Sequence, residues 1–128
     1  MKGARPPGKP VGGIAAGTRR QLLVLARRKG ARTTSFRPGR PTNWRPHSVR
    51  NPNGAFEERF TDFTAWEFIA SRLEAGEAVK EVVLQKPKGK KGYVMKIDLG
   101  VGLRTLYVKL QLGSGIIIGR SFHYSKHG

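Results

Sequence analysis

The segment from Leu106 to Gly128, "LYVKLQLGSGIIIGRSFHYSKHG", carries the side chains best suited to acid–base chemistry. His123 is the one histidine expected within a strand, and imidazole has an unperturbed pKa near neutrality, so it is the candidate general acid or base. Tyr107 could donate a proton or stack on a base, and Lys96 and Lys109 could stabilise developing negative charge. These four side chains suit cleavage of RNA through its 2′-hydroxyl group.

The same side chains also have an interpretation without chemistry. His123 could be an ordinary residue of a terminal strand, and the lysines could form a solvated face. Metal-dependent hydrolysis requires clustered carboxylates, whereas Asp98 is the only acidic residue after Glu81. We therefore expect no metal and no other cofactor.

One helix and four strands are expected to position these groups. The sequence "FTDFTAWEFIASRLEAG" offers Asp62 or Thr64 as an N-cap, has apolar residues at helical spacing and ends at Gly76. Strands are expected at Val79–Gln85, Tyr93–Leu99, Thr105–Leu112 and Ile116–Ser125. Their short glycine-containing connections require antiparallel neighbours. The sequence therefore predicts an α+β fold in which a helix or helices precede a four-stranded antiparallel meander.

Alternation within the third strand puts its leucines and Val108 on one face and Tyr107, Lys109 and Gln111 on the other. Two registers with the last strand are open at the turn from Gly113 to Gly115. A three-residue turn, which we prefer because it matches apolar to apolar residues, pairs Tyr107 with Ser121 and leaves Arg120 on the core face. A two-residue turn shifts the partner by one residue and brings Arg120 and Phe122 to the polar face.

The charge of the chain points to nucleic acid as a partner. The formal net charge is +17 and the sequence pI about 11.4, which favours binding of polyanions. Residues 1–50 hold 13 Lys and Arg and no acid, and all 8 acids lie between Glu57 and Asp98. The residues that we expect to contact RNA are Lys86, Lys88, Lys90, Lys91, Arg104, Arg120, Arg45 and Trp44.

Proline and glycine interrupt the first part of the chain. We expect residues 1–55 to form a flexible basic arm with one short helix, capped by Thr18 and ended by Gly30, and residues 56–128 to form the folded domain. Within the arm, Trp44 lies among arginines and could stack on unpaired bases. Alternatively, Trp44 could attach a solvated linker to the folded domain.

Cysteine is absent, and no apolar run approaches the roughly 18 residues of a membrane span. The sequence thus predicts a cytoplasmic protein that does not enter a membrane.

The helix and strands from about residue 61 to residue 126 resemble the C-terminal half of the RelE/MqsR-type toxins, the messenger-RNA endoribonucleases of bacterial toxin–antitoxin systems. The pattern "LYVK" is similar to the penultimate strand of this family, and "SFH" is similar to its last strand. The resemblance implies metal-free cleavage of messenger RNA, on or off the ribosome, and an antitoxin protein as partner. It assigns Tyr107 to the position of the catalytic tyrosine, and places His123 where the family has a lysine.

A second class of function remains open, a non-catalytic protein that binds ribosomal or other structured RNA. The acid-free basic segment favours it, because an extended basic chain can follow the phosphates between RNA helices. The polar face with Tyr107 and His123 favours the nuclease.

Both classes predict RNA binding that weakens steeply with salt, because the docked cations displace counterions from the phosphates. The dissociation constant, measured against salt concentration, should rise linearly on logarithmic axes. If residues 1–50 are the main contact, their deletion should flatten this slope. An unchanged slope would contradict that assignment.

Overall fold

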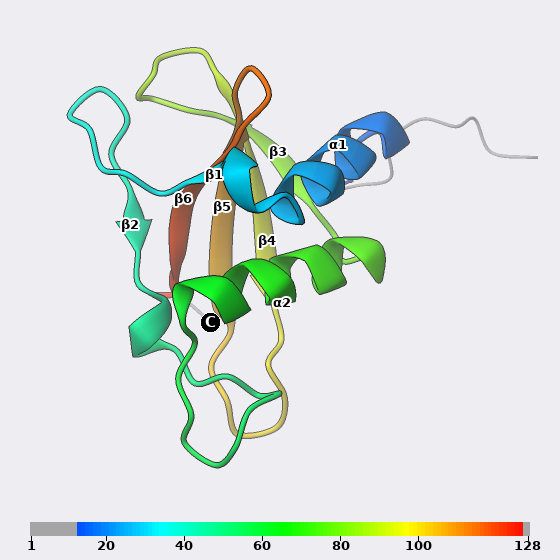
Figure 1. Ribbon diagram of the computed structural model, residues 1–128, viewed down its shortest axis with the longest axis vertical. Helices are drawn as coiled ribbons and strands as arrows, with labels where there is room; N and C mark the ends of the chain where they lie inside the picture. The colour runs from blue at the N-terminus through cyan, green and yellow to red at the C-terminus, as the bar shows by residue number, and fades with distance from the viewer. Residues whose placement is uncertain (1–12, 127–128) are drawn as a thin grey trace, which may run out of the picture.

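The computed structural model describes residues 13–126, which form two α-helices and one mixed sheet (Figure 1). The helices are α1 (Ala16–Ala26) and α2 (Asp62–Glu74), and two short 3-10 turns occupy Lys29–Ala31 and Pro46–Ser48. The strands are β1 (Arg32–Thr33), β2 (Asn43–Trp44), β3 (Lys80–Val83), β4 (Lys91–Ile97), β5 (Leu106–Leu112) and β6 (Ile117–Tyr124). The predicted α+β class is confirmed.

The sheet has the order β1-β6-β5-β4-β3, and β2 also pairs with β6. The four longer strands are antiparallel neighbours, as expected from their short connections. The expected count of four strands is too low, because β1 and β2 run parallel to β6 along its outer edge. They lie between α1 and α2 in the sequence, so the helices do not simply precede the strands.

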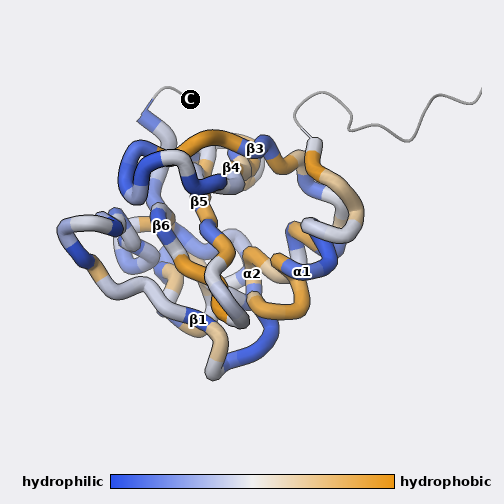
Figure 2. Tube along the Cα trace, turned by 90° about the horizontal axis from the view of Figure 1, so that it is seen from above, coloured by the Kyte–Doolittle hydropathy of each residue, from blue (hydrophilic) through white to orange (hydrophobic). Residues whose placement is uncertain are grey.

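Both helices lie on one side of the sheet, which leaves the opposite face free of helices (Figure 1, Figure 2). The hydrophobic core fills the space between them. Its large and fully buried side chains include Trp66, Ile69 and Leu73 from α2, Leu22 from α1, and Met95, Leu110 and Phe122 from the strands. Trp66 and Phe68, expected as core residues from their helical spacing, are both buried. We call the sheet surface without helices the open face.

Local signals explain the ends of α2. Thr61 is the N-cap, and its side chain and that of Thr64 each accept a hydrogen bond from the other's backbone N–H. The cap therefore lies one residue before the expected Asp62. At the other end Gly76 adopts a φ of 89°, which a glycine reaches without steric cost, and the chain leaves the helix there as predicted. Thr18 lies within α1, which begins at Ala16 without a side-chain cap.

The first part of the chain packs into the folded domain, although its composition is typical of a separate linker. Ile14, Leu22, Leu25, Ala31 and Val49 belong to the same core as α2 and the sheet. The expected flexible arm of residues 1–55 is therefore wrong for residues 13–55, and its first 12 residues lie outside the described part. Deletion of residues 1–50 would remove core side chains, so the salt dependence is better measured on the full chain. No helix within residues 13–126 is long and apolar enough to cross a membrane.

The register between β5 and β6 differs from the preferred expectation. Leu112 pairs with Ile117, as a two-residue Ser114–Gly115 turn requires, and Gly113 N–H donates to the carbonyl of Ile116. Beyond Leu110 and Gly119 a β-bulge shifts the pairing by one residue, so that Tyr107 pairs with His123. The preferred pairing of Tyr107 with Ser121 is thus wrong. The alternative register, with a two-residue turn, holds only between the turn and the bulge.

Gly119 leaves the space that the ring of Trp44 occupies. A Cβ atom at this position would lie 2.5 Å from Cζ3 of Trp44, whose ring is also stacked on Trp66 at a centroid distance of 5.0 Å. Because both indole rings are packed, neither can move away easily. Gly119 therefore permits β2 to lie against β6.

We expect Gly119→Ala to lower the free energy of unfolding by about 1–3 kcal/mol, the usual cost of overpacking a core. Gly17→Ala is the matched control, because a Cβ at Gly17 meets nothing within 4 Å and alanine favours a helix. Denaturant unfolding of both variants measures the difference. Equal stability of the two variants would show that the position of Trp44 is not constrained by Gly119.

Candidate active site

Lys96, Tyr107 and His123 form one row across the open face. Lys96 of β4 pairs with Tyr107 of β5, which pairs with His123 of β6, so the three side chains leave the sheet on the same side. Together with Ser125 and Lys126 they line a depression of about 170 Å³. The structure thus brings together three of the four residues that the sequence indicates as catalytic.

The rings of Tyr107 and His123 are stacked, with centroids 5.3 Å apart and planes inclined by 26°. His123 Nδ1 lies 2.8 Å from the carbonyl oxygen of Tyr124. Because a carbonyl oxygen only accepts, the neutral imidazole carries its proton on Nδ1 and keeps the lone pair on Nε2. Burial raises the pKa of Tyr107, so its hydroxyl group remains protonated and can donate a hydrogen bond at neutral pH.

The β-bulge in β6 is what places His123 in this row. Arg120 is the extra residue, since Gly119 pairs with Leu110 and Ser121 with Lys109. Side chains alternate along a strand, so without the extra residue Phe122 would face Tyr107 and His123 would point into the core. The bulge returns Phe122 to the core and directs His123 to the open face.

Arg120 itself is buried, and each nitrogen of its guanidinium donates a hydrogen bond within the protein. Its Nε donates to the carbonyl oxygen of Pro41 at 2.8 Å, Nη1 donates to Gln111 Oε1 at 2.7 Å, and Nη2 donates to the carbonyl oxygen of Lys86 at 2.6 Å. Arg120 was expected on the core face in the preferred register and as a contact to RNA. It instead lies beneath the loops that cover one end of the open face, where it has a structural role.

Lys109 lies two residues after Tyr107 on β5, and its side chain is on the same face of the sheet. It pairs with Val94 and Ser121 and lines a second depression, of about 440 Å³, together with Lys86 and Arg120. Burial and the charge of Arg120 lower the pKa of Lys109. The fourth expected catalytic residue is therefore beside the first depression and does not line it.

The other expected RNA contacts lie at different places on the surface. Lys86, Lys88 and Lys90 are exposed in the loop before β4, and Lys91 is exposed at the start of that strand. Arg104 is exposed in the loop before β5, at the opposite end of the sheet (Figure 1). Its guanidinium lies 4.7 Å from the ring centroid of Tyr124. These cations do not form a single patch.

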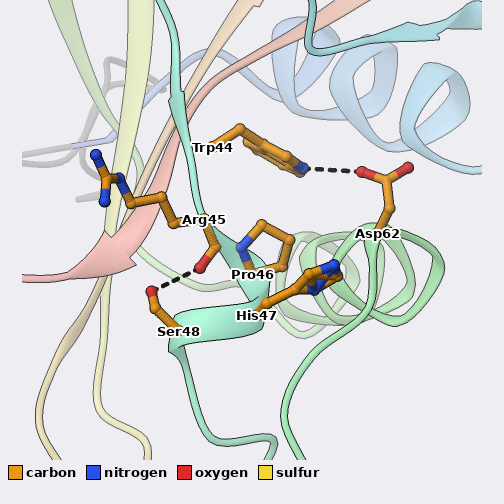
Figure 3. Close-up of a pocket in the computed structure, with 6 residues that line it drawn as sticks. All are labelled: Trp44, Arg45, Pro46, His47, Ser48 and Asp62. Atoms are coloured by element: carbon orange, nitrogen blue, oxygen red, sulfur yellow. Dashed lines mark hydrogen bonds between the residues drawn. The ribbon is translucent and has the colours of Figure 1, made fainter.

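Trp44 attaches its segment to the rest of the fold. Its ring is stacked on Trp66, and its Nε1 donates to Asp62 Oδ1 at 2.8 Å (Figure 3). These contacts favour the anchoring interpretation over stacking on bases. Arg45 extends to the other side of the strand, away from Trp44 (Figure 3), and is exposed. Its N–H donates to the carbonyl oxygen of Phe122, so its backbone lies beside that of His123.

Sequence reasoning missed Ser125 and Lys126 as lining residues and the place of Arg45 beside the row. Ser125 and Lys126 are the first two residues after the last strand, which is a usable signal, whereas Arg45 reaches the site only through a parallel pairing between distant segments. Among residues 13–126, no group of three or more His, Asp or Glu side chains could hold a metal ion. Comparison with protein-family models, curated proteins and solved structures finds no match to this chain.

The structural role of Arg120 predicts a large loss of stability when it is replaced. Arg120→Met should lower the free energy of unfolding by at least roughly 2 kcal/mol, because buried hydrogen-bond acceptors lose a charged donor. The control is Arg20→Met, which removes the same charge from an exposed position on α1 and should change stability by less than about 0.5 kcal/mol. Thermal or denaturant unfolding tests this. Similar stabilities would show that the three hydrogen bonds contribute little.

Proposed function

We propose that this protein is a metal-independent endoribonuclease that cleaves RNA by attack of a 2′-hydroxyl group on the adjacent phosphate. The observation that carries the proposal is the row of Lys96, Tyr107 and His123 in one depression of the open face. A base, a hydrogen-bond donor and a cation are the groups that this reaction needs.

The order of the three side chains supports an in-line displacement. Neighbouring strands are about 4.8 Å apart, so Lys96 and His123 start about 10 Å apart with Tyr107 between them. His123 Nε2 accepts the proton of the 2′-hydroxyl, and the 2′-oxygen forms a bond to phosphorus. The bond from phosphorus to the 5′-oxygen breaks on the opposite side, where the Lys96 ammonium group supplies the proton. The products are a 2′,3′-cyclic phosphate and a free 5′-hydroxyl.

Tyr107 acts between these two groups as a donor to a non-bridging oxygen of the pentacovalent phosphorus. Its raised pKa favours this role over loss of its proton, because a hydrogen bond to the charged oxygen needs the protonated phenol. The stacked ring also holds the His123 imidazole in a fixed orientation. Tyr107 therefore both stabilises charge and positions the base.

The resemblance to the RelE/MqsR-type toxins extends this proposal to a biological role. It supports a cytoplasmic toxin that acts on messenger RNA and is inhibited by a separate antitoxin protein. The alternative is a basic protein that binds RNA without cleaving it. The two differ in one measurable property, which is cleavage by the purified protein.

We expect His123→Ala and Tyr107→Phe each to reduce the rate of RNA cleavage by about two to four orders of magnitude, as is usual on loss of an acid–base or charge-stabilising group. RNA affinity should change little, because the surrounding cations remain. The assay is carried out in excess chelator, since no carboxylate of residues 13–126 lines the depression. Single-turnover cleavage and binding are measured on the same RNA.

His47→Ala is the matched control, because His47 is exposed and lies outside the row. It should cleave at the wild-type rate. Wild-type protein that binds RNA without cutting it, or normal cleavage by the His123 and Tyr107 variants, would overturn the proposal and favour the binding protein. Complete loss of cleavage in chelator with recovery in magnesium would also contradict it.

A further inference from the structure

The second depression on the open face adjoins the first, and Tyr107 lines both. It has a volume of about 440 Å³. Its polar lining includes Lys86, Lys109 and Arg120, and its apolar lining includes Pro41, Val82 and Leu84. A depression lined by both cations and apolar side chains has the chemistry to bind one nucleotide of an RNA strand.

The charges around this depression are not compensated by a carboxylate of residues 13–126 in its lining. Burial and the charge of Arg120 lower the pKa of Lys109, and burial and the charge of Arg40 lower the pKa of Arg120. Arg40 also has a buried Nε that makes no hydrogen bond. Partly buried cations that face one another without an anion are unfavourable, and a bound anion would relieve this repulsion.

Lys86 and Lys109 have the donors most available to such an anion. All three nitrogens of the Arg120 guanidinium already donate to protein oxygens. The Nζ atoms of Lys86 and Lys109, by contrast, make no hydrogen bond or ion pair within residues 13–126. Arg120 fixes the carbonyl groups of Lys86 and Pro41, which holds two walls of the depression in place. Arg120 therefore ties both loops to β6, and the two ammonium groups have no partner within residues 13–126.

We propose that this depression is a subsite for the nucleotide next to the cleaved bond, with Lys109 and Lys86 on its phosphate and the apolar side chains against its base or ribose. This inference rests on the proposed function, because the first depression is taken to hold the scissile phosphate. Tyr107 and Lys109 are two residues apart on β5, or about 7 Å. An extended RNA strand that follows β5 presents its successive phosphates to these two side chains.

The experiment compares the binding of dinucleotides that differ only in one terminal phosphate. His123→Ala protein is used so that the RNA stays intact, and a phosphate is placed on either the 5′ or the 3′ end. One of the two phosphorylated forms should bind about tenfold more tightly than the unphosphorylated dinucleotide, since its added phosphate meets Lys109. The preferred end gives the direction of the RNA strand along β5.

Lys109→Met in the same background should abolish this preference, and Lys109→Arg should retain most of it. Methionine keeps an unbranched side chain at this half-buried position, and thermal melting checks that both variants fold. The control is Lys29→Met, which removes an exposed charge that does not line the depression and should leave the preference unchanged. With His123 restored, Lys109→Met should raise the KM for longer RNA and leave kcat nearly unchanged.

A tenfold preference that survives Lys109→Met, or the lack of any preference before this substitution, would overturn the subsite. The binding measurement does not depend on cleavage. Protein that shows the preference but never cuts RNA would therefore refute the proposed function and leave a phosphate site at Lys109. Protein that cuts RNA but shows no preference for a phosphorylated dinucleotide would refute the subsite and leave the proposed function in place.

Discussion

The bulge at Arg120 is the constraint on which the candidate site depends. A strand alternates its side chains with a period of two, so one extra residue reverses the direction of every side chain that follows. In β6 the extra residue keeps Phe122 in the core and His123 opposite Tyr107. Three hydrogen bonds from the Arg120 side chain join β6 to β5 and to two loops. The residue that creates the bulge is therefore also tied to three other segments of the fold.

Gly119, the residue before the bulge, has a separate role on the core face of the sheet. Gly119 makes room for the ring of Trp44, and Trp44 brings β2 to the edge of β6. This parallel pairing carries Arg45 to a position beside His123. Two adjacent residues, Gly119 and Arg120, thus fix both the core packing of the edge strand and the direction of the candidate acid–base group.

The regular parts of the fold could be predicted from the sequence, and the irregular parts could not. Helical spacing with Gly76 identified α2, and alternation placed Tyr107 on the polar face of β5, where the structure pairs it with Lys96. A bulge has no signature in alternation, so the pairing of His123 was missed. The strands β1 and β2 have two residues each and pair only with β6, so nothing in their own segments indicates a sheet. Their composition of Pro, Gly and Arg is typical of a linker.

The positions of the acidic residues determine which of the cations have a carboxylate partner. Several acids interact within the fold: Glu74 with Arg27, Glu77 with Arg72, and Asp62 with Trp44. None of the acids lines either depression of the open face. Within residues 13–126 the lysines of these depressions make no ion pair with a carboxylate, whereas Arg27 and Arg72 near the helices do. An approaching polyanion is attracted to the protein as a whole by its charge of +17, and the open face combines that field with hydrogen-bond donors fixed by strands.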